Sequence, residues 1–436
     1  MSRYSIGSWG GLRVAEPDIL APDDFASSPV FEDRALPFGN GRSYGDSCLN
    51  SAGRAILSQS NNRILSFNSQ IGTLEAEAGV LLSDIIAHVA PHGWFPAVVP
   101  GTQFVTLGGA IANDIHGKNH HRRGTFGCHV LNIQLDRSDT DKNPQDIGPG
   151  SELFEATIGG MGLTGLIRNA TIQLMPIGAS QITQVTTRFD NLETYFELAE
   201  AADEKHEYAV AWIDSLSKGK QFGRGHLIAG DHAEEGEFPQ IRSKARLSVP
   251  FKPFITPLQG PFLRLFNEAY FRGAPAGTST KTEQFDKFFF PLDRLGHWNR
   301  LYGPRGLHQH QSVLPEAGGF EAVKSLLECT HMLGQGSFLT VLKRFGSVPS
   351  PGVMSFPRPG YTLTLDFPDK GKVTLDLLQK LDDITLSVGG AVNPYKDRRM
   401  APETLAASFP EWRTLEALRD PALCSDFWTR TALKLN

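Results

Sequence analysis

The sequence is poor in cysteine and lacks the short cysteine spacings that bind metals or build disulfide scaffolds. Its four cysteines lie tens of residues apart: Cys48, Cys128, Cys329 and Cys424. With no CxxC pair among them, neither a zinc knuckle nor a disulfide framework is indicated.

Long apolar runs are absent as well. No stretch reaches the roughly 18 consecutive apolar residues that span a bilayer. The first twenty residues include Glu16 and Asp18 and have no apolar signal core. The sequence therefore predicts a cytoplasmic protein.

An excess of basic charge is also missing. The formal net charge is −5, which argues against broad nucleic-acid binding, because that needs a basic footprint. The 40% hydrophobic and 20% charged residues are ordinary for globular proteins and exclude disorder and coiled coils. At roughly 150 residues per domain, the 436 residues correspond to about three domain-sized units, or to two with one enlarged.

Glycine is the residue in excess. The 44 glycines make up about 10% of the chain, where roughly 7% is usual. They gather at 39–45, 101–127 and 159–165. Because glycine is costly to order, such clusters indicate tight turns or close approach of the backbone to a ligand.

Hydrophobic patterning predicts several elements. Residues 72–80 alternate like a strand, and 81–89 have helical spacing that Pro91 and Gly93 end. A helix is expected at 377–384. A strand is expected at 338–343, with Leu339, Val341 and Lys343 on one face and Phe338, Thr340 and Leu342 on the other. After Pro176 the helical runs and the strands become longer, which predicts a domain boundary near 178.

Two glycine motifs could bind a nucleotide. Residues 160–165 fit GxGxxG, but alternating residues 170–175 follow, and the dinucleotide fingerprint needs a helix there. In residues 39–45, successive backbone N–H groups can form a nest for phosphate, with Arg42 and Ser43 as further donors. The alternative for this loop is a surface turn.

A third motif indicates what such a loop binds. The string Ile-His-Gly-Lys-Asn-His-His at 115–121 lies within a glycine-punctuated region at 100–127. The order and spacing of these motifs resemble the flavin-binding domain of the vanillyl-alcohol-oxidase superfamily, and within it the decaprenylphosphoryl-β-D-ribose oxidase branch. Further matching motifs extend through nearly the whole chain, at 37–47, 163–165, 208–212, 298–300, 309–311, 337–343 and 389–397.

The resemblance implies an α+β fold of two domains, with a substrate domain built on a mainly antiparallel sheet. The FAD-binding domain would cover 1–178 and the substrate-binding domain 179–388. Residues 389–436 would return to the FAD domain.

The same resemblance implies which residues bind FAD. They are Pro37, Phe38, Gly39, Asn40, Gly41, Arg42, Ser43, Tyr44, Gly45, Asp46, Ser47, Gly101, Thr106, Leu107, Gly108, Gly109, Asn113, Asp114, Ile115, His116, Ile167 and Asn393. Many superfamily members attach flavin covalently to a histidine in the first loop. This chain has Tyr44 there, so we expect non-covalent FAD.

Flavin-dependent oxidation of an alcohol needs a hydride donor near the flavin and a base for the hydroxyl proton. The family implies Lys396, His116 and Lys343 as catalytic residues, with Lys396 as the essential lysine. From the sequence alone, a lysine is more often a solvated surface charge. Lys343 differs because it shares an apolar face with Leu339 and Val341.

The substrate residues implied are Gln309, Gln311, Trp212 and Lys118. The two glutamines lie two apart, so in a strand both face the same way and could address sugar hydroxyls. Trp212 on an apolar run would otherwise be core. No metal site is expected from the four histidines at 116, 120, 121 and 129, since Gly117 and Asn119 oppose a helix there.

Three positions depart from the family. Asn393 stands three residues before Lys396, where a tyrosine is common, and Tyr395 follows two residues later. Thr364 replaces a cysteine, and His310 replaces an aromatic residue between the glutamines. These positions bear on which sugar the pocket accepts.

Residues 238–267 contain five basic residues, five phenylalanines and no acidic residue. This segment could lie peripherally on an anionic inner membrane or admit a polyprenyl-phosphate tail. A packed insertion with incidental charge is the alternative.

Together the motifs predict oxidation of a secondary sugar hydroxyl to a ketone. The expected substrate is C2 of a polyprenyl-phosphoryl pentose such as ribose, as the first half of a 2-epimerisation that a short-chain reductase partner completes. Oxidation of a free sugar, alditol or aldonolactone is the alternative enzyme, and a binding protein in a cell-envelope complex is the alternative of another class.

Overall fold

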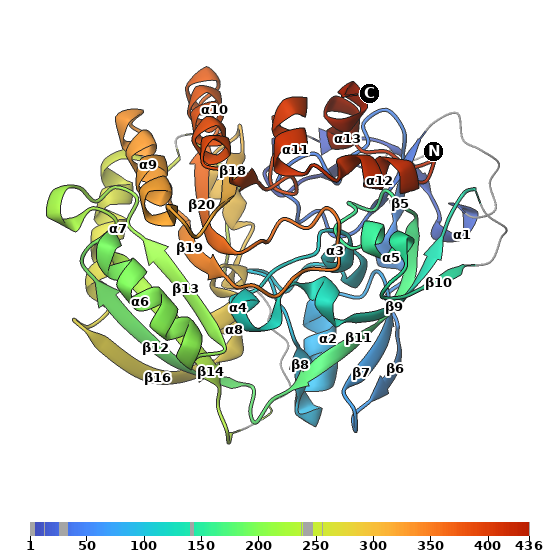
Figure 1. Ribbon diagram of the computed structural model, residues 1–436, viewed down its shortest axis with the longest axis horizontal. Coiled ribbons are helices and arrows are strands. Elements are labelled where there is room, and N and C mark those ends of the chain that lie inside the picture. The colour runs from blue at the N-terminus through green and yellow to red at the C-terminus, as the bar shows by residue number, and fades with distance from the viewer. Residues whose placement is uncertain are drawn as a thin grey trace.

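A computed structural model of the chain describes residues 5–12, 14–25, 34–139, 144–236, 238, 247–254 and 256–435. Figure 1 shows two halves, each built around a β-sheet, with the C-terminal helices above them. The fold is of the α+β class with a mainly antiparallel larger sheet, as predicted.

The first half contains a six-stranded antiparallel sheet and a small parallel sheet. The six-stranded sheet has the order β10-β9-β11-β7-β6, and β8 also pairs with β11. Its strands are β6 (Ile64–Asn68), β7 (Thr73–Glu77), β8 (Trp94–Pro96), β9 (Val130–Asp136), β10 (Gln145–Ile147) and β11 (Leu166–Pro176). The parallel sheet consists of β3 (Asp18–Leu20), β5 (Arg54–Leu57) and β4 (Ala35–Phe38).

Short helices cover the first half and hold its loops. They are α1 (Pro22–Phe25), α2 (Leu82–Val89), α3 (Leu107–Ala112), α4 (His120–Arg123) and α5 (Glu152–Thr157). The expected strand is β7, and the expected helix is α2, which ends before Gly93 in the left-handed conformation (φ 79°). The literal GxGxxG motif leads into β11 and not into a helix, as the sequence analysis anticipated.

The second half is an eight-stranded sheet in which every pairing is antiparallel. In order, its strands are β16 (Thr278–Gln284), β12 (Gln181–Phe189), β14 (Gly225–His232), β13 (Tyr208–Ile213), β19 (Thr340–Phe345), β20 (Gly360–Pro368), β18 (Leu307–Leu314) and β21 (Ala391–Val392). The chain enters this sheet between Pro176 and Gln181, beside the boundary predicted near 178.

The period of two along these strands gives the sheet two different faces. Leu363 and Leu365 of β20 pack under three long helices, whereas Thr364 between them faces the opposite way. The helices are α6 (Leu192–Lys205), α9 (Gly319–Met332) and α10 (Lys372–Ser387). Helix α10 contains the helix predicted at 377–384. The uncovered face is therefore free to line a cavity.

One prediction for this sheet was wrong in detail. Leu339, Val341 and Lys343 face the cavity together as expected, but Phe338 also lines it. Phe338 was placed on the opposite face by strict alternation. The alternation does not reach Phe338 because β19 begins only at Thr340.

The C-terminal segment connects both halves. After β21, the chain continues through α11 (Pro402–Ser408), α12 (Trp412–Leu418) and α13 (Asp426–Arg430). These helices share a buried cluster with Leu36 and Leu163 of the first half. The Ala35 N–H donates to Ala422 O at 2.8 Å, so the segment also extends the parallel sheet.

Two further helices lie near the second half. They are α7 (Gly260–Gly273) and α8 (Phe285–Phe289). Of the predicted basic and aromatic segment 238–267, Arg242, Lys244 and Arg246 lie outside the described residues. None of the helices that the structure describes is long and apolar enough to cross a membrane.

Candidate active site

A cavity of about 780 Å³ lies where the glycine loops of the first half meet the uncovered face of the eight-stranded sheet. Ligand pockets typically have volumes of about 300–1,000 Å³. The cavity is thus large enough for a cofactor or a sizeable substrate. Its lining joins residues far apart in sequence, from Trp9 to Lys396.

The loop after β4 forms one wall of the cavity. Gly39 approaches Thr106 so closely that a Cβ there would lie 2.5 Å from Thr106 Oγ1, and Gly41 has a φ of +59°. The loop therefore needs glycine at both positions. Arg42 lies over the ring of Trp9, with its Cζ 4.4 Å from the ring centroid.

This wall contains buried polar groups that have no hydrogen-bond partner in the described part of the protein. Arg42 Nε and Ser47 Oγ are buried and have no hydrogen-bond partner among the described residues. Burial also lowers the pKa of Arg42. A buried donor without a partner is costly, so these groups fit an anionic ligand such as a pyrophosphate.

Helix α3 continues the same wall. The side chain of Thr106 caps the helix by accepting a hydrogen bond from Gly109 N at 3.1 Å. Gly108 packs on Ala78, where an added Cβ would lie 2.9 Å from the Ala78 Cβ. Gly108 and Gly109 also line the cavity, so a ligand can approach the helix backbone directly.

Most residues predicted to bind the cofactor line the cavity. They are Pro37, Gly39, Asn40, Gly41, Arg42, Ser43, Tyr44, Ser47, Gly101, Thr106, Gly108, Gly109, Asn113, Ile115, His116, Ile167 and Asn393. All seven predicted catalytic and substrate residues line it as well: Lys396, His116, Lys343, Gln309, Gln311, Trp212 and Lys118.

Five predicted cofactor residues lie behind the lining. Phe38 and Leu107 are buried in hydrophobic clusters. Gly45 packs against Asp397, and Asp46 forms an ion pair with Arg430 at 2.8 Å. Asp114 accepts a hydrogen bond from Gly127 N at 2.8 Å. These residues shape the loops that carry the lining residues.

His116 belongs to a hydrogen-bonded row on the opposite wall. Gln311 Nε2 lies 3.2 Å from His116 Nε2, and Asn393 Nδ2 donates to Gln311 Oε1 at 2.9 Å. An amide N–H donor requires His116 Nε2 to accept, which leaves the ring proton on Nδ1. Burial lowers the pKa of His116 well below 6.5, and the positive charge of Lys343 adds to this. His116 is therefore a neutral donor through Nδ1.

Three lysines are buried in the same cavity. Burial lowers the pKa of Lys118 to about 7, and Lys118 Nζ donates to Phe288 O at 2.6 Å. Burial and the two neighbouring lysines lower the pKa of Lys343 to about 7, and Lys343 Nζ donates to Gly117 O at 3.2 Å. Burial lowers the pKa of Lys396 to about 8, an effect that Asp366 opposes. Such perturbed groups in one cavity mark a functional site.

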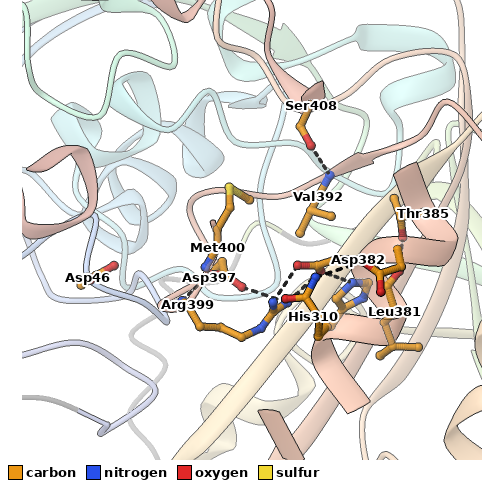
Figure 2. A network of polar contacts seen from close by, with 12 residues as sticks. Asp46, His310, Leu381, Asp382, Thr385, Val392, Asp397, Arg399, Met400 and Ser408 are labelled. Atoms are coloured by element: carbon orange, nitrogen blue, oxygen red, sulfur yellow. Dashed lines mark hydrogen bonds and ion pairs between the residues drawn. The ribbon is translucent and has the colours of Figure 1, made fainter. Parts of the chain in front are cut away.

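Lys396 lies over an aromatic ring, and the turn that carries it is fixed by ion pairs of a neighbouring residue. Its Nζ lies 4.5 Å from the centroid of the Tyr44 ring. The residues just after it enter a buried polar network, shown in Figure 2, in which Arg399 binds Asp382 at 2.6 and 2.7 Å. His310 of β18 bonds the same carboxylate at 3.2 Å. Arg399 and His310 thus fix the turn that carries Lys396 against β18 and α10.

Asp366 is a residue that the sequence analysis missed. It is fully buried on β20 and accepts hydrogen bonds from Gln309 Nε2 at 2.6 Å and Tyr302 Oη at 3.3 Å. Burial raises its pKa to about 7, while Gln309 and Lys396 lower it. A single carboxylate within the otherwise uncharged stretch at 361–367 was the available signal. Its partner Gln309 is set by strand register, in which the two residues are paired.

The structure places each of the residues that depart from the family pattern. The Tyr395 hydroxyl lies 2.8 Å from both Gly159 O and Met354 O, so its one proton is shared with backbone carbonyls. Asn393 occupies the row beside Gln311. Thr364 lines the cavity, whereas His310 points to Asp382 on the far face.

The other histidines of the His-rich segment have separate partners. His120 packs against Phe345, with ring centroids 4.5 Å apart. His121 Nε2 lies 3.0 Å from His206 O, and His129 Nε2 lies 2.9 Å from Arg123 O. Helix α4 begins only at His120, so His116 and His120 do not share a helix.

Comparison with known proteins identifies the family. A family model described as an FAD-binding domain matches residues 31–137. The chain is 35% identical over 426 residues to decaprenylphosphoryl-beta-D-ribose oxidase of Mycolicibacterium smegmatis, which covers 94% of this chain and 91% of that protein. The chain belongs to the decaprenylphosphoryl-β-D-ribose oxidase family.

Two other relatives bear on this assignment. An uncharacterized protein in the mprA 5' region of Streptomyces coelicolor is 33% identical over 352 residues, or 77% of this chain and 94% of that protein. L-gulonolactone oxidase of Mus musculus is 24% identical over 143 residues, 32% of each chain. The membership predicted from the motifs is thus confirmed, and the protein is an FAD-dependent oxidoreductase.

Proposed function

We propose that this member of the decaprenylphosphoryl-β-D-ribose oxidase family oxidises a secondary sugar hydroxyl to a ketone. The observation that carries the proposal is the pairing of two unlike walls in one cavity. One wall offers bare glycine backbone with Arg42 and Ser47, and the other offers Lys396, His116 and Gln311. The first suits a pyrophosphate and the second suits a polyol.

We propose that FAD lies along the glycine wall, with the residue roles that the motifs predict. Bound FAD supplies the acceptor for the hydride that leaves the alcohol carbon. Tyr44 is buried and its pKa is raised well above 10 by burial, so it is a poor nucleophile and the cofactor is dissociable. Residues 1–178 and 389–436 would form the FAD domain and 179–388 the substrate domain.

Lys396 takes the proton from the hydroxyl as the carbon loses its hydride. A pKa of about 8 leaves part of the amine neutral near neutral pH, as a general base requires. His116 donates through Nδ1 and fixes the hydroxyl oxygen. Loss of the hydride and of the proton converts the secondary alcohol to a ketone.

We propose that the substrate is a polyprenyl-phosphoryl pentose that is oxidised at C2. The relative from Mycolicibacterium smegmatis, named for decaprenylphosphoryl-ribose, supports this choice. Oxidation at C2 would be the first half of an epimerisation, and a reductase partner would supply the second half. The gulonolactone oxidase relative covers only 32% of this chain, so a free sugar, alditol or aldonolactone remains the second candidate.

Replacement Lys396→Ala tests the assignment of the base. We expect anaerobic flavin reduction by prenyl-phosphoryl ribose to slow by about 10²–10⁴-fold, the usual contribution of general base catalysis. Stopped-flow absorbance of the flavin measures this rate. Acid precipitation of wild type and variant should release equal yellow FAD to the supernatant, which shows that both bind the cofactor without a covalent bond.

Three outcomes would each contradict a part of the proposal. Unchanged flavin reduction in Lys396→Ala would remove Lys396 as the base. Bleaching of the wild-type flavin by a soluble alditol or lactone, with no response to prenyl-phosphoryl ribose, would replace the lipid-linked substrate with the free one. A yellow pellet after acid would show a covalent flavin.

A further inference from the structure

Helix α7 has an exposed apolar stripe beside its buried face. Leu263, Asn267 and Phe271 are buried at a spacing of four residues. Next to them the apolar residues Phe262, Leu265, Phe266, Ala269 and Tyr270 are exposed at spacings of three and four. Phe262 and Leu265 are 57% and 68% exposed. Soluble surfaces rarely expose such a continuous stripe without a binding role.

The stripe is continuous with the cavity. Phe266 and Tyr270 line the cavity at one edge of the stripe. Tyr270 packs edge-on against Trp212, with the ring centroids 4.7 Å apart. The ring centroids of Phe266 and Phe338 lie 5.1 Å apart. An apolar path therefore leads from the predicted substrate residue Trp212 to the outer surface of α7. Figure 1 places this helix at the left-hand end of the molecule.

Residues 247–254, which precede α7 in the chain, also expose apolar side chains. Leu247, Phe251 and Phe254 are 72%, 69% and 98% exposed. Leu247 belongs to β15 (Leu247–Ser248), which pairs with β17 (Leu295–Gly296), so this end of the segment is anchored. Aromatic side chains at this exposure are typical of groups that enter a membrane interface.

The charges beside these residues favour an anionic partner. Lys252 and Arg264 are exposed and basic. The acidic residue of the helix, Glu268, is already paired with Arg224 and Arg272, both at 2.5 Å. A mixed apolar and basic face fits an anionic lipid surface better than a neutral one.

We propose that α7 and residues 247–254 form a docking surface for an anionic phospholipid bilayer. The apolar stripe inserts at the level of the acyl boundary, and Lys252 and Arg264 contact lipid phosphates. The mouth of the cavity then faces the bilayer. On the proposed function, the prenyl tail of the substrate can stay in lipid while its sugar reaches Gln309 and Lys396.

Vesicle binding by the full-length holoprotein tests the docking surface without any substrate. We expect co-sedimentation with phosphatidylglycerol-containing vesicles, weaker binding to pure phosphatidylcholine, and release at high salt as the charges are screened. The double variant Phe262→Ser/Leu265→Ser should weaken binding about tenfold. A matched control is Met332→Ser/Val373→Ser, because both residues are exposed and apolar but lie on α9 and α10.

Equal vesicle binding by wild type and the α7 variant would overturn the docking surface, as would an equal loss in the control variant. A second measurement separates docking from catalysis. The α7 variant should oxidise a short, water-soluble prenyl-phosphoryl pentose at the wild-type rate and a vesicle-embedded long-chain substrate more slowly. If the wild type binds vesicles but oxidises neither substrate, the proposed function fails and the docking surface stands.

Discussion

At the scale of single residues, the site depends on which protons buried groups hold. Lys396 and Asp366 perturb each other inside the cavity: the carboxylate raises the pKa of the lysine, and the lysine lowers the pKa of the acid. Gln309 connects Asp366 to the cavity through a hydrogen bond of 2.6 Å. We therefore regard Asp366 as a positioning residue that sets both the amide of Gln309 and the basicity of Lys396.

The replacement Asp366→Asn keeps the size of the side chain and removes its charge. Without the carboxylate the pKa of Lys396 falls, so the neutral amine is present at lower pH. The acid limb of the kcat/KM pH profile should move down by about one pH unit. Tyr302→Phe keeps the carboxylate and removes only a hydrogen bond that lowers its pKa, so its limb should move less than that of Asp366→Asn. An equal shift in both variants would indicate altered packing and not charge.

The residues of the site were predictable to different degrees. Gln309 and Gln311 share a face because strand periodicity requires it, and Lys343 follows Leu339 and Val341 for the same reason. Asp366 and Trp9 were not predicted. Asp366 meets Gln309 through the register of β18 on β20, and Trp9 meets Arg42 through the path of the N-terminal segment. Neither contact leaves a pattern in the local sequence.

At the scale of elements, the turn that carries Lys396 is fixed by a buried ion pair. Burial by itself would raise the pKa of Asp382 of α10. The hydrogen bonds and charges of His310 and Arg399 outweigh burial, so the pKa of Asp382 lies below its ordinary value. Sequence periodicity predicted the helix that is α10 and the shared face of Gln309 and Gln311 on β18. It could not predict that His310, between two cavity-facing glutamines, would connect the sheet to α10 from the other face.

Arg399→Met tests this connection. Removing one partner of a buried ion pair leaves a charge uncompensated and typically costs about 3–5 kcal/mol. We expect a loss of that size in the free energy of unfolding, measured by urea titration. Adding Asp382→Leu removes the stranded carboxylate and should recover part of the loss. A destabilisation below about 1 kcal/mol in the single variant would show that the pair does not hold the turn.

At the scale of the whole molecule, the chain concentrates positive charge inside an acidic protein. The net charge is −5, yet Arg42, Lys118, Lys343 and Lys396 line one cavity. The motif order predicted the family and fold class correctly because it extends across both halves. The cavity itself could not be predicted, since it arises only where the sheet face and the glycine loops meet.

The apoprotein should become more stable as the pH rises from about 7 to 8.5. In this window the unfolded chain keeps its lysines protonated, with a pKa near 10.5, while Lys118, Lys343 and Lys396 lose protons in the native state at about 7, 7 and 8. Because the unfolded state binds more protons at these lysines, stability rises by up to about 1.4 kcal/mol per pH unit for each such proton. Asp366, whose native pKa burial raises to about 7, opposes this rise, but its effect fades above pH 7 and the three lysines dominate. Thermal unfolding midpoints of the apoprotein across this range measure the slope.

A single lysine variant assigns that slope to the cavity. Lys343→Met removes one of the three native-state deprotonations and should flatten the rise by about a third, whereas Lys220→Met changes an exposed lysine and should leave it unchanged. The window ends near pH 8.5 because Cys48, whose pKa burial raises to about 12, acts in the opposite direction above the ordinary thiol pKa. A stability that is flat or falls between pH 7 and 8.5 would mean that the buried lysines stay protonated, and Lys396 would then lack the neutral amine that the proposed chemistry requires.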